Sequence, residues 1–134
     1  TETLVLFANM KGVRFEIEQY DPFIDTKLNV DQKHILYRII QELTNNTIKY
    51  ADATQITLTL KSGGKNCLIE YADNGRGFDM KKVKKGVGFE SIQTRVDSYN
   101  GKLKMASSKG KGVKVQVAIP FLTAASLEAA LERR

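Results

Sequence analysis

An acidic residue followed by two alternating glycines ends an apolar, strand-like run, and this feature constrains the chain most strongly. The hexapeptide is Asp73-Asn74-Gly75-Arg76-Gly77-Phe78. Glycine accepts positive φ and lets a ligand approach the bare backbone. An ionised carboxylate only accepts hydrogen bonds, so it suits a ligand that presents an N–H. The hexapeptide therefore predicts either a backbone-lined pocket with one carboxylate or a tight turn with a solvated Asp.

The composition is that of a single soluble globular domain. The chain has 134 residues, of which 42% are hydrophobic and 27% charged, enough for one core. No apolar run approaches the roughly 18–20 residues that cross a bilayer, and no signal peptide opens the chain. The single cysteine, Cys67, lies in an apolar strand pattern and is predicted to be a buried structural thiol. These features predict a cytoplasmic domain without direct membrane contact.

The net charge of +6 and the pI near 9.4 permit binding to a polyanion. Part of the excess lies in Lys81-Lys82-Val83-Lys84-Lys85, between two glycine motifs. Such a run is either a solvated loop or a means of steering a polyphosphate towards a pocket. The aromatic interleaving of a nucleic-acid platform is not evident. We therefore expect no nucleic-acid partner, and a steep salt dependence of DNA affinity would be needed to argue otherwise.

A long amphipathic helix is predicted from Val30 to Tyr50. Asn29 is its expected N-cap, and Gln32, three residues later, completes a capping box. Its apolar positions recur at helical spacing: Ile35, Leu36, Ile39, Ile40 and Leu43. Before this helix, Val13, Phe15 and Ile17 alternate with charged residues and predict a strand with one buried face.

Two polar residues of this helix lie in or beside its apolar arc. Projected at about 100° per residue, Asn46 falls between Ile35 and Ile39, and Glu42 falls at the edge of the arc. Lys49 follows one turn later. Polar groups directed at a core cost stability unless they are paired or bind something. A ligand site is favoured here over a merely structural Asn.

The rest of the chain predicts two β-hairpins and a second helix. The expected strands and helix are 56–60, 66–72, 89–99, 102–106 and 113–119, with turns at 62–65 and 109–112. Gly86-Val87-Gly88 precedes the second helix, where free N–H groups favour a phosphate. The order predicts an α+β fold: a two-layer sandwich with a mixed, mostly antiparallel sheet covered on one face by helices.

Together these pieces resemble the ATP-binding catalytic domain of two-component sensor histidine kinases, in the GHKL ATPase superfamily. Four motifs carry the resemblance, in the order of the family: 42–50 is similar to the N box, 73–78 to the first glycine box, 86–95 to the second and 110–120 to the third. The match covers about residues 12 to 120. The phrase at residues 36–43 resembles the subfamily that pairs with helix-turn-helix response regulators.

The resemblance implies a role for each matching residue. Asp73 would accept the adenine amino N–H, Asn46 would coordinate Mg²⁺, and Glu42 would be the catalytic polar or general-base residue near the γ-phosphate. The glycines of the second box would let a lysine-rich lid close on the phosphates. The full set of implied nucleotide-binding residues is Asn46, Lys49, Tyr50, Asp73, Gly75, Gly77, Lys85, Gly86, Gly88, Phe89, Gly110 and Gly112.

Three residues depart from the usual pattern of the family. Tyr50 stands where the subfamily usually has His, Phe89 replaces a common Leu, and Val113 stands where a Thr often follows the third glycine box. None of these is the central residue of a motif, so nucleotide binding is expected to survive. His34 is followed by Ile35 rather than an acid, so it does not fit the role of the phosphoacceptor.

The chain is thus expected to be the catalytic part of a larger kinase. Its implied partners are ATP, the dimerisation and phosphoacceptor domain of the same kinase, and the receiver domain of a response regulator; alone it is expected to be monomeric. Residues 1–11 would end a preceding helix or linker, 12–120 would form the ATPase domain, and 121–134 would be a tail. An anti-sigma-factor-type serine kinase and a non-catalytic nucleotide-binding module remain as alternatives.

Overall fold

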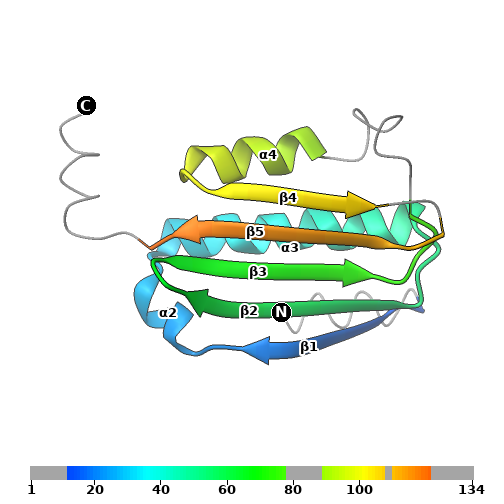
Figure 1. The fold of residues 1–134 in the computed structure, drawn as a ribbon, viewed down its shortest axis with the longest axis horizontal. Coiled ribbons are helices and arrows are strands. Elements are labelled where there is room, and N and C mark those ends of the chain that lie inside the picture. Colours follow the sequence, from blue (N-terminus) through cyan, green and yellow to red (C-terminus); the bar gives the residue numbers. More distant parts are fainter. Residues whose placement is uncertain (1–11, 78–88, 108–109, 122–134) are drawn as a thin grey trace.

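Five strands form one mixed sheet, in the order β1-β2-β3-β5-β4 (Figure 1). The computed structural model describes residues 12–77, 89–107 and 110–121. Its strands are β1 (Arg14–Tyr20), β2 (Gln55–Gly63), β3 (Asn66–Asp73), β4 (Lys102–Ser107) and β5 (Val113–Pro120). Its helices are α2 (Phe23–Lys27), α3 (Val30–Tyr50) and α4 (Phe89–Ser98).

Only the β1–β2 pair is parallel. β2 with β3, β3 with β5 and β4 with β5 are all antiparallel, so the predicted mixed, mostly antiparallel sheet is confirmed. The register sets Asp73 opposite Ile56 on one side and Val113 on the other. The last residue of β3 therefore lies between two neighbouring strands, near the ends of both.

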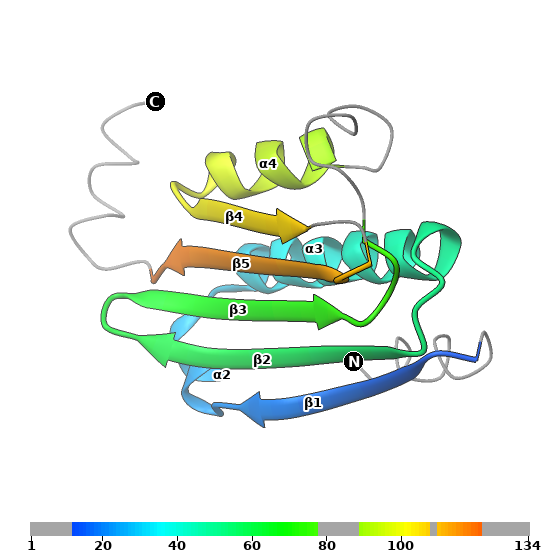
Figure 2. The ribbon, with the colours of Figure 1, turned by 45° about the vertical axis from the view of Figure 1, so that its right-hand side comes forward.

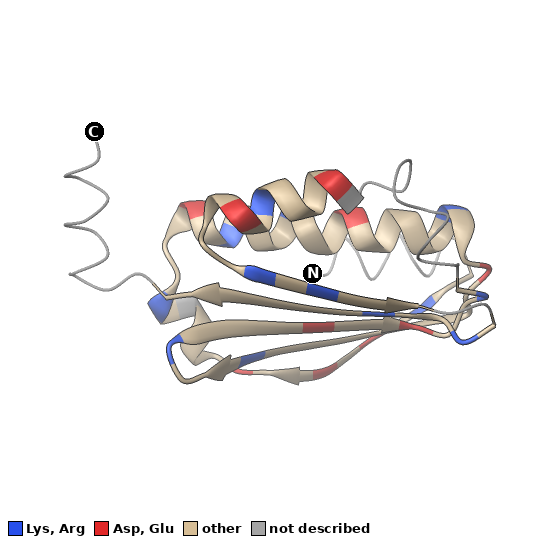
Figure 3. Cartoon of the chain, turned by 45° about the horizontal axis from the view of Figure 1, so that its top comes forward, with Lys and Arg blue, Asp and Glu red and all other residues tan. Residues whose placement is uncertain are grey.

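Helices cover one face of the sheet, as predicted (Figure 3). α3 runs along the middle of the sheet and α4 lies beside β4 (Figures 1 and 2). The buried positions alternate along the inner strands, which is the pattern of a sheet with one covered face. The covered face carries Ile56, Leu58, Leu60, Cys67, Ile69, Tyr71, Val113, Val115, Val117 and Ile119.

The long helix begins and ends where the sequence predicts. The Asn29 side chain accepts a hydrogen bond from Gln32 N (2.8 Å), and the Gln32 side chain accepts one from Asn29 N (3.1 Å). The predicted capping box is therefore confirmed. Gln32 also donates to the carbonyl of Pro120 (3.0 Å), which ties the start of α3 to the end of β5.

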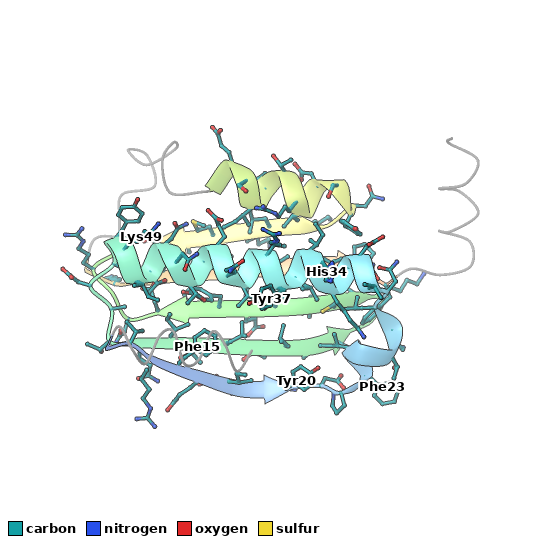
Figure 4. The ribbon with its side chains drawn as sticks, turned by 180° about the vertical axis from the view of Figure 1, so that it is seen from behind. Phe15, Tyr20, Phe23, His34, Tyr37 and Lys49 are labelled. Atoms are coloured by element: carbon teal, nitrogen blue, oxygen red, sulfur yellow. The ribbon has the colours of Figure 1, made fainter. Side chains whose placement is uncertain are left out.

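The prediction that Ile17 lies on the buried face of its strand is wrong. Ile17 is 39% exposed, whereas Val13 and Phe15 are buried. The pairing with β2 shifts between Ile17 and Gln19, which marks a bulge. β1 is an edge strand, and α3 covers the middle of the sheet rather than this edge (Figure 4).

The helices differ from the prediction in two respects. The short helix α2 was not predicted; Asp21 Oδ1 accepts a hydrogen bond from Phe23 N (3.0 Å) at its start. α4 ends at Ser98 rather than Tyr99. Asn100 there adopts φ +56 and Gly101 N donates to the carbonyl of Val96 (2.9 Å), so the predicted Asn-Gly stop is confirmed. Within the described residues, no helix is long and apolar enough to cross a membrane.

Candidate functional site

Asp73 is a buried carboxylate at the end of β3. Its side chain is on the same face of the strand as Cys67, Ile69 and Tyr71, because successive side chains alternate between faces. Asp73 is 8% exposed and is the one buried acidic residue among those that the structure describes. A buried charge needs hydrogen-bonding partners, so its contacts define the site.

Both carboxylate oxygens of Asp73 accept hydrogen bonds. Oδ1 accepts from the backbone N–H of Gly75 (2.9 Å) and of Val113 (3.2 Å). Oδ2 accepts from the hydroxyl of Thr47 in α3 (2.9 Å). A carboxylate oxygen has two lone pairs, so Oδ2 retains the capacity to accept one further N–H. The sheet and α3 thus fix the carboxylate from two sides.

Tyr71 extends this contact into the core. Its hydroxyl lies 2.5 Å from Thr47 Oγ1 and donates to the carbonyl oxygen of Leu43 (3.1 Å). Burial raises the pKa of the Tyr71 phenol far above its ordinary value, and the hydrogen bond with Thr47 opposes this only in part. Tyr71 therefore remains a neutral O–H donor at any working pH.

Two predicted glycines pack closely against backbone at this site. A Cβ at Gly75 would overlap the carbonyl oxygen of Ala51 and lie 2.7 Å from its Cβ. A Cβ at Gly112 would overlap the carbonyl oxygen of Asp73 and lie 3.4 Å from its Oδ1. Gly112 also has φ +74, which other residues adopt at a cost. Both positions therefore need glycine for a physical reason.

The loop after β3 is tied to the end of α3 and to the turn before β5. Arg76 N donates to the carbonyl of Ala51 (2.7 Å), and Arg76 Nε donates to the carbonyl of Tyr50 (2.9 Å). Gly110 N donates to the carbonyl of Arg76. Gly77 adopts φ +64 in the same loop. The first and third glycine motifs are therefore neighbours in the structure.

Asn74 fastens the same loop to the start of β2. Its Oδ1 accepts from the backbone N–H of Thr54 and of Gln55, both at 2.9 Å. Its Nδ2 donates to the Thr54 hydroxyl (2.8 Å). Asn74 therefore holds the backbone of the hexapeptide, and Asp73 is left to face the helix layer.

The predicted residues of α3 lie along the helix towards the same end. Glu42 and Asn46 are half-buried, and Lys49 is exposed near the end of α3 (Figure 4). Asn46 immediately precedes Thr47, which contacts Asp73. The Tyr50 side chain is 49% exposed, and only its carbonyl joins the loop contacts. His34 is exposed further back on the same helix.

Part of the predicted site falls outside the described residues. These positions are Lys85, Gly86 and Gly88, together with the lysine run. Phe89 begins α4, but its side chain is not described. Among the described residues, no three His, Cys, Asp or Glu side chains gather so that they could hold a metal ion. Cys67 is buried, and burial raises the pKa of its thiol to about 11.

Thr47 and Tyr71 belong to the site and were not predicted from the sequence. For each residue, its position in the sequence pattern indicates burial. Thr47 projects into the apolar arc of α3, near Leu36, Ile40 and Leu43. Tyr71 stands two residues before Asp73 and so shares its face of β3. These positions indicate buried hydroxyls, but only the packed structure shows that they meet each other.

Comparison with known proteins identifies the family. Residues 31–123 match the model of the histidine kinase-, DNA gyrase B- and HSP90-like ATPase family. Among curated proteins, the chain is 34% identical over 110 residues to the sensor histidine kinase ComP of Bacillus subtilis, covering 80% of this chain and 14% of ComP. It is 30% identical over 98 residues to the sensor histidine kinase LiaS of the same organism, covering 72% of this chain and 27% of LiaS.

Solved structures show the same fold. The blue-light activated histidine kinase EL346 of Erythrobacter litoralis has a TM-score of 0.74 at 14% identity, over 96% of this chain and 41% of that one. The Acinetobacter baumannii histidine kinase AdeS has a TM-score of 0.73 at 13% identity, over 91% of this chain and 63% of that one.

The fold and the matched residues define an ATPase domain of the kind found in histidine kinases. The chain belongs to the histidine kinase-, DNA gyrase B- and HSP90-like ATPase family. The predicted resemblance and fold class are therefore confirmed, and the family match supports ATP as the ligand. The chain spans about a seventh to a quarter of the length of these two curated relatives.

Proposed function

We propose that this chain binds Mg·ATP and donates the γ-phosphate to a histidine on a separate dimerisation domain, as the catalytic part of a sensor histidine kinase. The observation that carries the proposal is the buried Asp73 carboxylate, held by Gly75, Val113 and Thr47. It lies in a glycine-lined loop within a chain of this ATPase family. Family membership supports ATP as the nucleotide, and the carboxylate is a group that can select its base.

Asp73 fits the edge of an adenine ring. The 6-amino group of adenine donates an N–H, and Asp73 Oδ2 has the capacity to accept one beyond the Thr47 hydroxyl. A guanine carbonyl at the same position would face the carboxylate acceptor to acceptor, which is unfavourable. Gly75 and Gly112 let their backbone pack directly against Ala51 and Asp73, which fixes the chain around the carboxylate.

Asn46 and its neighbours on α3 are assigned to the phosphate side. The Asn46 amide oxygen is a hard ligand that suits Mg²⁺, with phosphate oxygens completing the coordination. When bound, Mg²⁺ neutralises charge on the phosphates. Glu42 lies one turn earlier on the same face and is assigned as the polar or general-base residue. Lys49 lies one turn later and contributes positive charge.

The remaining assignments concern a lid and the partners. Lys85, Gly86, Gly88 and Phe89 are assigned to a lid over the phosphates, and Tyr50, Gly77 and Gly110 to the rim of the pocket. The phosphoacceptor is a histidine of the dimerisation domain, and the response regulator receiver takes the phosphoryl group onwards in the cytoplasm. The named relatives ComP and LiaS are sensor histidine kinases, which supports this assignment.

Calorimetric titration with ATP, with and without Mg²⁺, tests the proposal on the wild type and on Asp73→Asn. Hydrogen bonds to charged groups contribute about 1.5–3 kcal/mol, so the variant is expected to bind ATP about 10- to 100-fold more weakly. Asp97→Asn is the matched control, because Asp97 is an exposed carboxylate on α4 that contacts Gln93. This control is expected to bind ATP like the wild type.

Phosphotransfer is tested separately, by adding the dimerisation domain of the same kinase and labelled ATP. An acid-labile, base-stable phosphoryl group on that domain is expected. An acid-stable phosphoserine on another protein would favour the serine-kinase alternative. Absence of ATP binding by the wild type would contradict the proposal and favour a non-catalytic interaction module.

A further inference from the structure

Two threonines three residues apart on the buried face of α3 direct their hydroxyls differently. Thr44 Oγ1 donates to the carbonyl of Ile40 (2.7 Å), four residues earlier. This is the usual contact of a Thr within a helix. Thr47 Oγ1 instead donates to Asp73 Oδ2 (2.9 Å) across the layer. For Thr47, the equivalent acceptor four residues earlier is the carbonyl of Leu43. Another group must therefore occupy that carbonyl.

Tyr71 occupies that position. Its hydroxyl donates to the Leu43 carbonyl (3.1 Å) and lies 2.5 Å from Thr47 Oγ1. Each hydroxyl has one proton. Because the proton of Thr47 is used on Asp73, the single proton of Tyr71 is shared between Thr47 Oγ1 and the carbonyl oxygen of Leu43 as a three-centre hydrogen bond. The phenol thus satisfies the oxygen of Thr47 and takes the carbonyl that would otherwise attract the Thr47 proton.

The position of Tyr71 is fixed by the sheet. It is 2% exposed and lies in β3, opposite Leu58 of β2 and Val115 of β5. A side chain in the middle strand of a packed sheet has little freedom to move. Tyr71 is also neutral because burial disfavours the phenolate. It therefore acts as a fixed donor next to Thr47.

We propose that Tyr71 is a positioning residue for adenine recognition: it acts through Thr47 to orient the Asp73 carboxylate. The proposal rests on the proposed function, since it assumes that Asp73 accepts an N–H from the base. Val113 stands where a Thr often follows the third glycine box, and it contributes only its backbone N–H to Asp73. In this chain the hydroxyl that donates to Asp73 belongs to Thr47 of α3, and Tyr71 orients that hydroxyl.

The test compares ATP with a purine nucleoside triphosphate that lacks the 6-amino group, titrated against the 134-residue chain. Tyr71→Phe retains the ring and removes the hydroxyl. Loss of one orienting hydrogen bond is expected to weaken ATP binding about 5- to 10-fold. The analogue donates nothing to Asp73, so its affinity is expected to change less than about twofold. The ratio of the affinity for ATP to the affinity for the analogue is therefore expected to be smaller in Tyr71→Phe than in the wild type.

A second pair of variants keeps the test valid if Tyr71→Phe does not fold. Thr47→Val preserves the side-chain shape without the hydroxyl and is expected to narrow the preference in the same way. Thr47→Ser retains a hydroxyl and is expected to restore it. Tyr99→Phe is the matched control, because Tyr99 follows α4 and no hydrogen bond joins it to Asp73 among the described residues.

Equal weakening of ATP and analogue in Tyr71→Phe would overturn the proposal, because a purely structural role affects both ligands alike. An unchanged preference in both Tyr71→Phe and Thr47→Val would overturn it as well. These results are distinct from failure of the proposed function. If the wild type binds ATP and Asp73→Asn binds it much more weakly, the proposed ATP site stands whatever the result for Tyr71.

Discussion

Replacing Gly112 by Ala tests how closely the third glycine motif must approach Asp73. Gly112 has φ +74, and an added Cβ would overlap the Asp73 carbonyl oxygen. Gly64, in the β2–β3 turn, has φ +61, and an added Cβ there meets nothing within 4 Å. Gly64→Ala is therefore a matched control that has the backbone cost without the collision.

The two costs can be estimated separately. An Ala in the left-handed region costs about 1 kcal/mol, which is the expected loss for Gly64→Ala. Overpacking against atoms that cannot move adds about 1–3 kcal/mol. Since the atom met by Gly112→Ala belongs to backbone fixed in the sheet, the expected total is about 2–4 kcal/mol.

Urea unfolding of both variants measures these losses. We expect both midpoints to fall at an unchanged m-value, with Gly112→Ala falling further. Calorimetry on the folded protein then measures ATP binding, which is expected to weaken in Gly112→Ala and to be unchanged in Gly64→Ala. Equal destabilisation by the two substitutions would refute the reasoning, because the close approach to Asp73 would then have no energetic consequence.

Two further predictions concern the frame around the site. Asn29→Ala removes the side chain that accepts from Gln32 N and is expected to lower stability by about 1 kcal/mol, measured by urea unfolding. Asp21 has a pKa held below its ordinary value of 3.8, first by its hydrogen bond with the Ser62 side chain and then by that with Phe23 N. Its stabilising contribution is therefore complete above 3.8 and lost as the pH falls through the lower folded value. In Asp21→Asn, the melting temperature is expected to fall less than in the wild type over that acid range; an identical acid-side slope would contradict this.

Helical and strand periodicity were enough to predict most of the frame. α3 has one apolar stripe and a capping box, so its bounds follow from local chemistry. The alternation in β3 and β5 likewise follows from one face being covered. Such features depend on residues close in sequence, which a sequence alone displays.

Features that depend on the sheet edge were harder to predict. Ile17 has the right spacing for the buried face, but a shift in pairing and the position of β1 at the edge leave it exposed. α2 has five residues, too few to show a helical period. In both cases the decisive fact is where the segment lies in the fold, which its own residues do not state.

The candidate site divides in the same way. Asp73 and the glycines at 75 and 112 could be proposed as site residues from the sequence, because the chemistry of each residue is unusual at its place in the chain. Thr47 and Tyr71 could not be linked, since they are separated by 24 residues and meet only through packing. A buried Thr or Tyr is ordinary by itself, and its function depends on the partner of its hydroxyl.

The contacts of Asp73 come from two layers of the fold. This explains why the ordered set of motifs was informative, although each motif alone was weak. Asp73 Oδ1 is held by the backbone N–H of Gly75, in the loop after β3, and of Val113 in β5, whereas Oδ2 is held by Thr47 from the helix layer. A loop with the same hexapeptide but no α3 packed behind it would expose its carboxylate to water. Water would then compete for the carboxylate and weaken its proposed preference for a base N–H. The proposed binding chemistry therefore requires both layers, and the sequence indicates this only when the motifs of both layers occur together.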